Sequence, residues 1–148
     1  MPALDFNCDL GEGCGSDAQI VPVVSSASIA CGAHAGDAAT MRATVALCRD
    51  HGVAIGAHPS FEDREHFGRR ELALPPTELH ALVTRQVALL ADACAEAGAT
   101  LRHVKPHGAL YNLAARDRAA ADAIAAAVRD FDPALLLYGL SGSCLADA

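Results

Sequence analysis

The sequence predicts a parallel α/β fold in which short buried strands alternate with amphipathic helices. Five short apolar runs carry this prediction, and each is bounded by glycine, proline or polar residues, as buried parallel strands are. Helical patterns lie between the runs, and this alternation is typical of a parallel sheet. The predicted strands cover residues 3–9, 26–31, 53–58, 100–105 and 134–140.

The first predicted helix follows the second strand. Asp37 can cap its N-terminus, and Gly52 ends it, since glycine is the usual residue just beyond a helix C-terminus. Its apolar side chains recur at helical spacing at Met41, Val45 and Cys48.

Two further helices are predicted in the second half of the chain. Pro76 is well placed as the first residue of a long helix that Gly98 closes, and a last helix covers residues 117–129. The predicted buried face of the long helix consists of Leu79, Leu82, Val83, Leu90 and Cys94, and that of the last helix includes Ile124 and Val128.

Length and composition indicate how many domains the chain has and which classes of partner and cellular compartment it suits. The 148 residues suggest one domain, residues 1–148, and a formal charge of −7 argues against a nucleic-acid partner. No apolar stretch approaches a membrane span. Six cysteines without a CxxC spacing, in a chain that shows no secretory leader, favour reduced thiols and a cytoplasmic protein.

The length also predicts an incomplete architecture. A full (β/α) barrel needs about 250 residues, and five strands are little more than half of one. We therefore expect a truncated barrel of about five βα units, or two copies that complete each other. Exposed strand edges in such a half-barrel favour a homo-oligomer.

Polar residues gather where the predicted strands end, which is the edge at which parallel α/β proteins bind ligands. Asp9 directly follows a buried run, where a carboxylate is costly without a partner, so a site role is favoured over a loop cap. Glu12 could equally be a solvated surface acid. Asn7 and Asp37 belong to the same strand-end segments.

Three histidines and one lysine share these ends. His34 and His58 could bind a divalent metal together with Asp9, or could instead serve in proton transfer or hydrogen bonding. Lys105 could stabilise a substrate oxyanion, the alternative being a structural pair with Asp9 or Asp37. His107 could act as a general acid or base.

Two loops could hold an anionic substrate. Arg69 and Arg70 suit a carboxylate or phosphate, although adjacent arginines often only solvate a loop. Gly11 and Gly13 follow the first strand and could expose backbone N–H groups to an anion, a weak signal because no P-loop pattern is present.

Five blocks of sequence run in order along the chain: NCDLGEG at 7–13, SASIACGAHAGD at 26–37, GVAIGAHPSF at 52–61, FGRR at 67–70 and HVKPHGALYN at 103–112. Together they resemble the signature of the LamB/YcsF family of 5-oxoprolinase components. Each block is modest by itself, and the five together are specific. Members of this family usually continue for about another hundred residues, so the chain corresponds to roughly the N-terminal three-fifths of one.

The resemblance implies a distorted parallel (β/α) barrel of the glycoside hydrolase/deacetylase type. It also implies ATP-dependent conversion of 5-oxo-L-proline to L-glutamate together with two partner subunits, B and C. Asp9, His34 and His58 fall where the related deacetylases hold a metal, and Lys105 and His107 lie in the HVKPHG block. Catalytic roles are expected for Asp9, Lys105 and His107, with Asp9 or His107 as the general base for water. Substrate contacts are expected from Asn7, Gly11, Glu12, Gly13, Asp37, Arg69 and Arg70.

Two other functions fit the same pattern. One is a metal-dependent deacetylase or amide hydrolase on the same fold, and the other is an inactive fragment with only a binding role. Fold alone does not choose among these functions, because related barrels host several chemistries.

Overall fold

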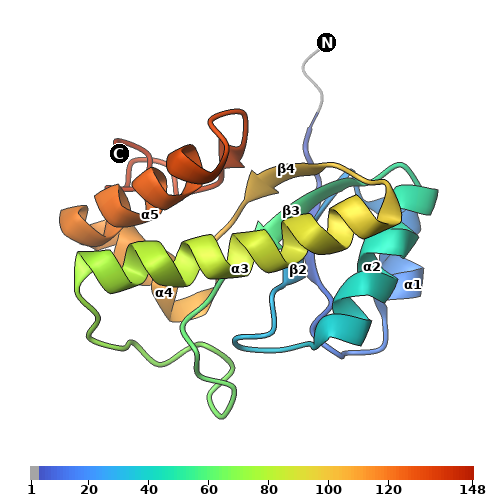
Figure 1. The fold of residues 1–148 in the computed structure, drawn as a ribbon, viewed down its shortest axis with the longest axis horizontal. Helices are drawn as coiled ribbons and strands as arrows, with labels where there is room; N and C mark the ends of the chain where they lie inside the picture. Colours follow the sequence, from blue (N-terminus) through green and yellow to red (C-terminus); the bar gives the residue numbers. More distant parts are fainter. Residues whose placement is uncertain (1–3) are drawn as a thin grey trace.

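The computed structural model describes residues 4–148 and is built on a five-stranded parallel sheet (Figure 1). The spatial order of the strands follows the chain, so each strand pairs with its predecessor in sequence. The strands are β1 (Asn7–Leu10), β2 (Ser26–Ala30), β3 (Ala54–His58), β4 (Leu101–Val104) and β5 (Leu136–Leu137). All five predicted strands are therefore present, each shorter than expected, and residue 3 of the first prediction lies outside the described residues.

The helices also follow the predicted pattern. Asp37 caps α2 (Ala38–Asp50) by accepting a hydrogen bond from the Thr40 backbone N–H at 2.7 Å. α3 (Pro76–Ala97) ends at Gly98 in the left-handed conformation, and α5 (Arg118–Phe131) begins after Asp117, whose side chain accepts from the Ala120 N–H. Unpredicted elements are α1 (Asp17–Ile20), a 3₁₀ turn η1 (Val21–Val23) and α4 (Gly108–Arg116).

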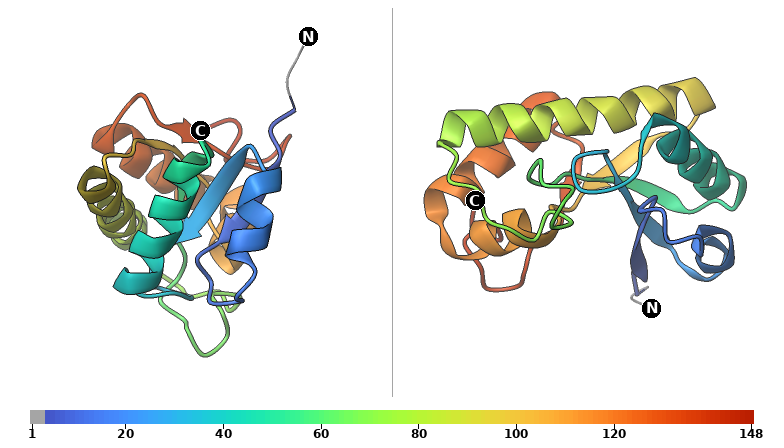
Figure 2. Two further views of the ribbon diagram at one scale, coloured as in Figure 1. Left: turned by 90° about the vertical axis from the view of Figure 1, so that its right-hand side faces the viewer. Right: turned by 90° about the horizontal axis from the view of Figure 1, so that it is seen from below.

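Helices α2 and α3 pack against the sheet, and α5 packs on α3 and α4 (Figures 1 and 2). The contact face of α3 is the stripe predicted from its spacing, because Leu79, Leu82, Val83, Leu90 and Cys94 are all buried. The core between the helices and the sheet is largely aliphatic, as the low aromatic content predicts, with the fully buried Phe61 within it.

The two faces of the sheet differ in polarity because side chains alternate along each strand. One row across the sheet is apolar and fully buried, and runs through Leu10, Ile29, Ala57 and Val104. The neighbouring row on the opposite face runs through Asp9, Ser28, Gly56 and His103. We call this second face the inner face, and it carries the polar residues discussed below.

Gly56 is required on the inner face by close packing. A Cβ at this position would overlap the His103 ring, so the imidazole crosses directly over the strand. The glycine in β3 thus makes room for a buried histidine in β4.

The sheet curls so that its ends approach each other across the inner face. Tyr138, just after β5, donates its hydroxyl to Asp5 Oδ2 at 2.8 Å, although the two residues are 133 positions apart in sequence. Within residues 4–148, β1 and β5 each pair with a single strand. The parallel α/β class is confirmed, while the closed barrel and the incomplete domain stay predictions.

Large apolar side chains are exposed beside both outer strands. Leu4 and Phe6 precede β1, Leu136 lies in β5, and Leu140 follows β5. This placement agrees with the expected homo-oligomer, which stays a prediction. Over the described part of the chain, no helix is both long enough and apolar enough to cross a membrane.

Candidate active site

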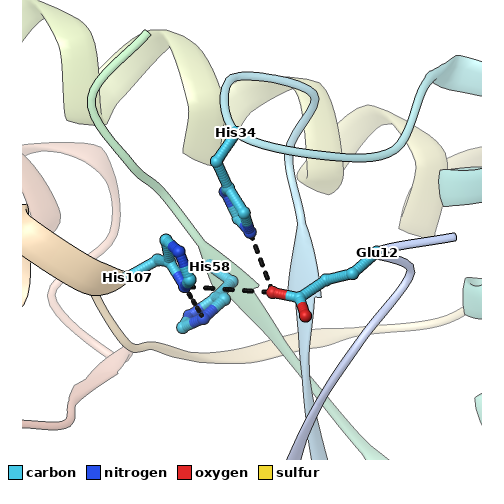
Figure 3. Close-up of side chains that lie close together, drawn as sticks. All are labelled: Glu12, His34, His58 and His107. Atoms are coloured by element: carbon cyan, nitrogen blue, oxygen red, sulfur yellow. Dashed lines mark hydrogen bonds and ion pairs between the residues drawn. The ribbon is translucent and has the colours of Figure 1, made fainter. Parts of the chain in front are cut away.

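Four side chains converge at the C-terminal ends of the strands (Figure 3). Glu12 follows β1, His34 follows β2, His58 is the last residue of β3, and His107 lies three residues beyond β4. One potential ligand atom from each lies within 4.8 Å of the others. The three histidines are buried and Glu12 is half-buried, so the group forms an enclosed polar cluster, here called the histidine cluster.

Backbone carbonyls fix the protonation of two of these rings. His58 Nδ1 lies 2.6 Å from the Lys105 carbonyl oxygen, and His107 Nε2 lies 2.8 Å from the Phe67 carbonyl oxygen. A carbonyl oxygen only accepts, so each of these nitrogens carries a proton. The remaining nitrogens, Nε2 of His58 and Nδ1 of His107, face each other at 3.0 Å.

His34 joins the cluster through Glu12. Its Nε2 lies 2.9 Å from Glu12 Oε1, and its ring stacks on His107 with centroids 3.8 Å apart. Nδ1 of His34 is buried and finds no hydrogen-bond partner among the described residues. The Phe67 ring meets both His34 and His107 edge-on and shields them on one side.

The long loop after β3 holds the cluster in place. Phe67 has a φ of 56°, unusual for a residue other than glycine, and this conformation directs its carbonyl toward His107. A Cβ on the following Gly68 would overlap Ser60 Oγ and would lie 2.9 Å from His34 Cβ. Arg64 ties this loop to the His34 loop, because its Nη1 donates to the Gly32 and Gly36 carbonyls at 2.8 Å each.

A second group adjoins the cluster on the inner face. Lys105 Nζ lies 2.5 Å from Asp9 Oδ1 and donates to Asn7 Oδ1 at 2.9 Å. The other oxygen of Asp9 lies 3.3 Å from His58 Nε2, which links the two groups. Lys105 is the single lysine of the chain, whereas arginine supplies the other ten basic residues.

The electrostatics follow from this packing. Burial by itself would raise the pKa of the Asp9 carboxyl, but His58 and Lys105 outweigh it and hold that pKa well below its usual range. The pKa of Glu12 is lowered in the same way, since the hydrogen bond with His34 and the nearby imidazoles together exceed the effect of burial. Burial lowers the pKa of His107 to about 4, so this imidazole is neutral at pH 7.

The structure brings together most of the predicted strand-end residues. The histidine cluster and the adjoining group contain Asn7, Asp9, Glu12, His34, His58, Lys105 and His107. The grouping differs from the expected Asp9, His34 and His58, because Glu12 and His107 lie beside the two histidines while Asp9 pairs with Lys105. The contact between Lys105 and Asp9 is the ion pair that the sequence analysis gave as the alternative to oxyanion stabilisation, and the catalytic role of Lys105 stays a prediction.

The other predicted substrate residues lie outside the cluster. The Gly11 N–H donates to Asp17 Oδ2 at 2.9 Å, Gly13 is exposed, and Asp37 caps α2. Arg70 Nη2 lies 3.5 Å from Asp63, and the Arg69 guanidinium lies 5.3 Å from the centre of the Phe67 ring. Of these residues, Arg69 is linked to the cluster through the Phe67 ring, which contacts both His34 and His107.

Sequence reasoning missed two contributors. His103 is 1% exposed and stacks on Tyr138, and its position two residues before Lys105 on a strand could have placed it on the inner face. Phe67 stands in the FGRR block, and no local pattern indicates that its carbonyl meets His107.

Known proteins resemble this chain in both sequence and structure. Residues 4–148 match the LamB/YcsF family. A crystal structure described as a lactam utilization protein from Thermus thermophilus is 47% identical and superposes with a TM-score of 0.95. The match covers 99% of this chain and 61% of that chain, so the sequence spans about three-fifths of its relative's length.

Proposed function

Because the chain belongs to the LamB/YcsF family, we propose that it contributes the site of a lactam hydrolase that opens 5-oxo-L-proline to L-glutamate. The observation that carries this proposal is the meeting of Asp9, Lys105 and the histidine cluster at one end of the sheet. Acidic, basic and imidazole groups from separate strand ends converge there within contact distance, as catalysis by several groups requires. The similarity to a protein described as acting in lactam utilization supports the substrate class.

Hydrolysis of an unactivated lactam explains a requirement for ATP. Transfer of the γ-phosphoryl group to the amide oxygen gives an electrophilic carbon with phosphate as the leaving group. Water then adds to that carbon, and the ring C–N bond breaks with a proton passing to nitrogen, which leaves an acyl phosphate. A second water displaces phosphate from this intermediate and gives the side-chain carboxylate of glutamate. We propose that the ATP site and part of the assembly come from partner subunits of the B and C type.

Each residue of the site has a role in this scheme. The Lys105 ammonium stabilises negative charge that develops on the amide oxygen. Asp9 is kept ionised by its two partners, so it acts as a fixed charge that orients Lys105 rather than as a base. His107, neutral at pH 7 with Nδ1 unprotonated, is the better general base for water. Arg69, with Arg70 beside it, holds the substrate carboxylate.

The histidine cluster favours a second candidate function, a metal-dependent amide hydrolase. His58 and His107 each donate one N–H to a backbone carbonyl and turn the other nitrogen inward, an arrangement typical of metal-ligating histidines. Glu12 and His34 offer a carboxylate oxygen and a third imidazole beside them. A divalent cation held by these four residues would polarise a carbonyl or lower the pKa of bound water.

One assay separates the two functions. Glutamate release from 5-oxoproline is measured with ATP and the candidate partner subunits, with and without a chelator, alongside ADP release. The first candidate predicts glutamate and ADP in equal amounts, and loss of about a hundredfold in kcat for Lys105→Ala. Exposed His51→Gln serves as the control and should retain full activity.

Other outcomes would redirect the assignment. Turnover of amide substrates without ATP that chelation abolishes would favour the metal-dependent function. Glutamate release that is equal in the wild type and Lys105→Ala would remove Lys105 from the mechanism. An absence of turnover under every condition would leave only a binding role.

A further inference from the structure

A chain of hydrogen bonds leads away from Lys105 along the inner face of the sheet. Lys105 Nζ donates to Asn7 Oδ1 at 2.9 Å, and Asn7 Nδ2 donates to Ser26 Oγ at 2.8 Å. Ser26 in turn donates its hydroxyl to Asp5 Oδ2 at 3.0 Å. This chain of hydrogen bonds thus begins at the Lys105 ammonium and ends at the Asp5 carboxylate, which precedes β1.

The two ends determine the direction of every bond between them. An ammonium can only donate, and an ionised carboxylate can only accept. A hydrogen bond from Ser25 lowers the pKa of the Asp5 carboxyl, which keeps this end ionised. If the Asn7 amide were reversed, its NH₂ group would face the Lys105 ammonium and its oxygen would face Ser26. Only one orientation of the amide therefore satisfies both ends.

Further contacts hold the same orientation. Ser28 donates to Asn7 Oδ1 at 3.1 Å, and His103 Nε2 lies 3.4 Å from Asn7 Nδ2. Both the oxygen and the nitrogen of the Asn7 amide therefore already have hydrogen-bond partners within the protein. It is better suited to positioning Lys105 than to the substrate contact that its place in the NCDLGEG block suggested.

Asp5 itself is held firmly although it is exposed. Its carboxylate accepts from the hydroxyls of Ser25 at 2.6 Å and Tyr138 at 2.8 Å, in addition to Ser26. Hydrogen bonds aligned head to tail strengthen one another by polarisation. A fixed carboxylate at one end can thus influence the order of an ammonium at the other.

We infer that Asp5 is a positioning residue for Lys105, acting through Ser26 and Asn7. Its effect on turnover rests on the proposed function, in which Lys105 meets the developing negative charge. Its effect on the order of the ammonium does not depend on any substrate.

The first test uses the fact that the chain has one lysine. In protein labelled with ¹⁵N at lysine Nζ, a single ammonium signal reports the order of Lys105. We expect a hydrogen-bonded, slowly exchanging signal in the wild type. Asp5→Asn and Ser26→Ala should both lower its order parameter and speed its proton exchange, because Asn at position 5 no longer enforces one direction and Ala at position 26 interrupts the chain.

Tyr138→Phe is the matched control, since it removes one other hydrogen bond that Asp5 Oδ2 accepts, while Ser25 and Ser26 still hold the carboxylate and all three bonds between Lys105 and Asp5 remain. Its lysine signal should match that of the wild type. Thermal melting of all variants separates a loss of order at Lys105 from a loss of fold. An unchanged signal in Asp5→Asn and Ser26→Ala, with the fold intact, would overturn the inference.

Kinetics supply an independent test. Asp5→Asn and Ser26→Ala should each lower kcat for glutamate release roughly fivefold to tenfold, with little change in KM. The double variant should lose no more than either single variant, because both substitutions interrupt the same chain. Additive losses would overturn a serial arrangement. If the lysine signal changes as expected but the wild type releases no glutamate, the positioning role stands and the proposed function fails.

Discussion

Nε2 of His58 and Nδ1 of His107 lie 3.0 Å apart, and the second nitrogen of each ring is bonded to a backbone carbonyl. If both rings are neutral, the facing nitrogens present lone pairs, which repel each other unless a cation, either a proton on His58 Nε2 or a metal ion, lies between or beside them. This relationship is the basis for a metal-binding prediction that needs no catalytic assay.

We predict that the wild type binds one equivalent of Zn²⁺ or a similar divalent ion. His58→Gln and His107→Gln should each weaken binding by about a hundredfold, because each removes one imidazole ligand from the cluster. Isothermal titration calorimetry measures the affinity and the stoichiometry. His51→Gln, at an exposed position in the turn after α2, should bind as the wild type does. Equal affinity in all four proteins would place the ion elsewhere.

Arg64→Ala should weaken the same site from outside it. The guanidinium links the loop after β3 to two carbonyls of the His34 loop, so its removal lets His34 move relative to His107. We expect Zn²⁺ affinity to fall by roughly tenfold, as for other residues that orient metal ligands. Arg42→Ala, which removes an exposed arginine 3.9 Å from Glu96, is the control. A comparable loss in both variants would indicate a general electrostatic effect instead.

We predict that the buried His103 makes the free energy of unfolding depend on pH. Burial lowers the pKa of His103 to about 4, below the ordinary value of 6.5 that applies in the unfolded chain. Between these values the unfolded chain binds a proton that the folded chain does not, so the free energy of unfolding falls as the pH drops from 6.5 toward 4. The loss from this residue is on the order of 3 kcal/mol, and it is absent at neutral pH.

Urea denaturation at a series of pH values measures this effect. His103→Gln should be less stable than the wild type at pH 7 but should lose less stability on acidification. Exposed His51→Gln should follow the wild-type curve. If the curves of His103→Gln and the wild type stay parallel between pH 6.5 and 4, the pKa of His103 is not lowered by folding.

Gly56→Ala tests the packing of the two central strands. The new methyl group would overlap the His103 ring, so the imidazole must leave its place against Tyr138 and Asn7. We expect a loss of about 3 kcal/mol in the free energy of unfolding, at the upper end of the usual cost of overpacking a core. Gly139→Ala, whose methyl group would lie nearest to Leu145 side-chain atoms at 3.2 Å and beyond, should cost under about 1 kcal/mol. Similar losses would show that the ring moves aside easily.

The sequence predicted the fold well because its signals are local. Asp37, Gly52, Pro76 and Gly98 mark helix ends through the chemistry of the backbone itself, and the structure places helix ends beside all four. α4 was missed because it starts at Gly108, the last residue of the HVKPHG block, and the preceding His107 provides no side-chain cap that would mark a helix start.

The site was only partly predictable for a related reason. His34, His58 and His107 could be identified because they follow or end predicted strands, and a parallel topology brings the C-terminal ends of its strands to one edge of the sheet. The choice between Asp9 and Glu12 depends on side-chain direction. Asp9 points along the inner face toward Lys105, whereas Glu12, in the loop beyond, reaches His34. Sequence spacing carries no information about that divergence.

The sequential strand order has a consequence for how the site is assembled during folding. Each strand pairs with the one made just before it, so the sheet can grow one βα unit at a time as the chain leaves the ribosome. The cluster would then be filled in the order Glu12, His34, His58 and His107. Until β4 docks, His58 lacks both the carbonyl that fixes its proton and the imidazole that faces it. If the sheet forms in that order, the predicted ligand-binding cluster is complete only when the fourth strand has joined the sheet.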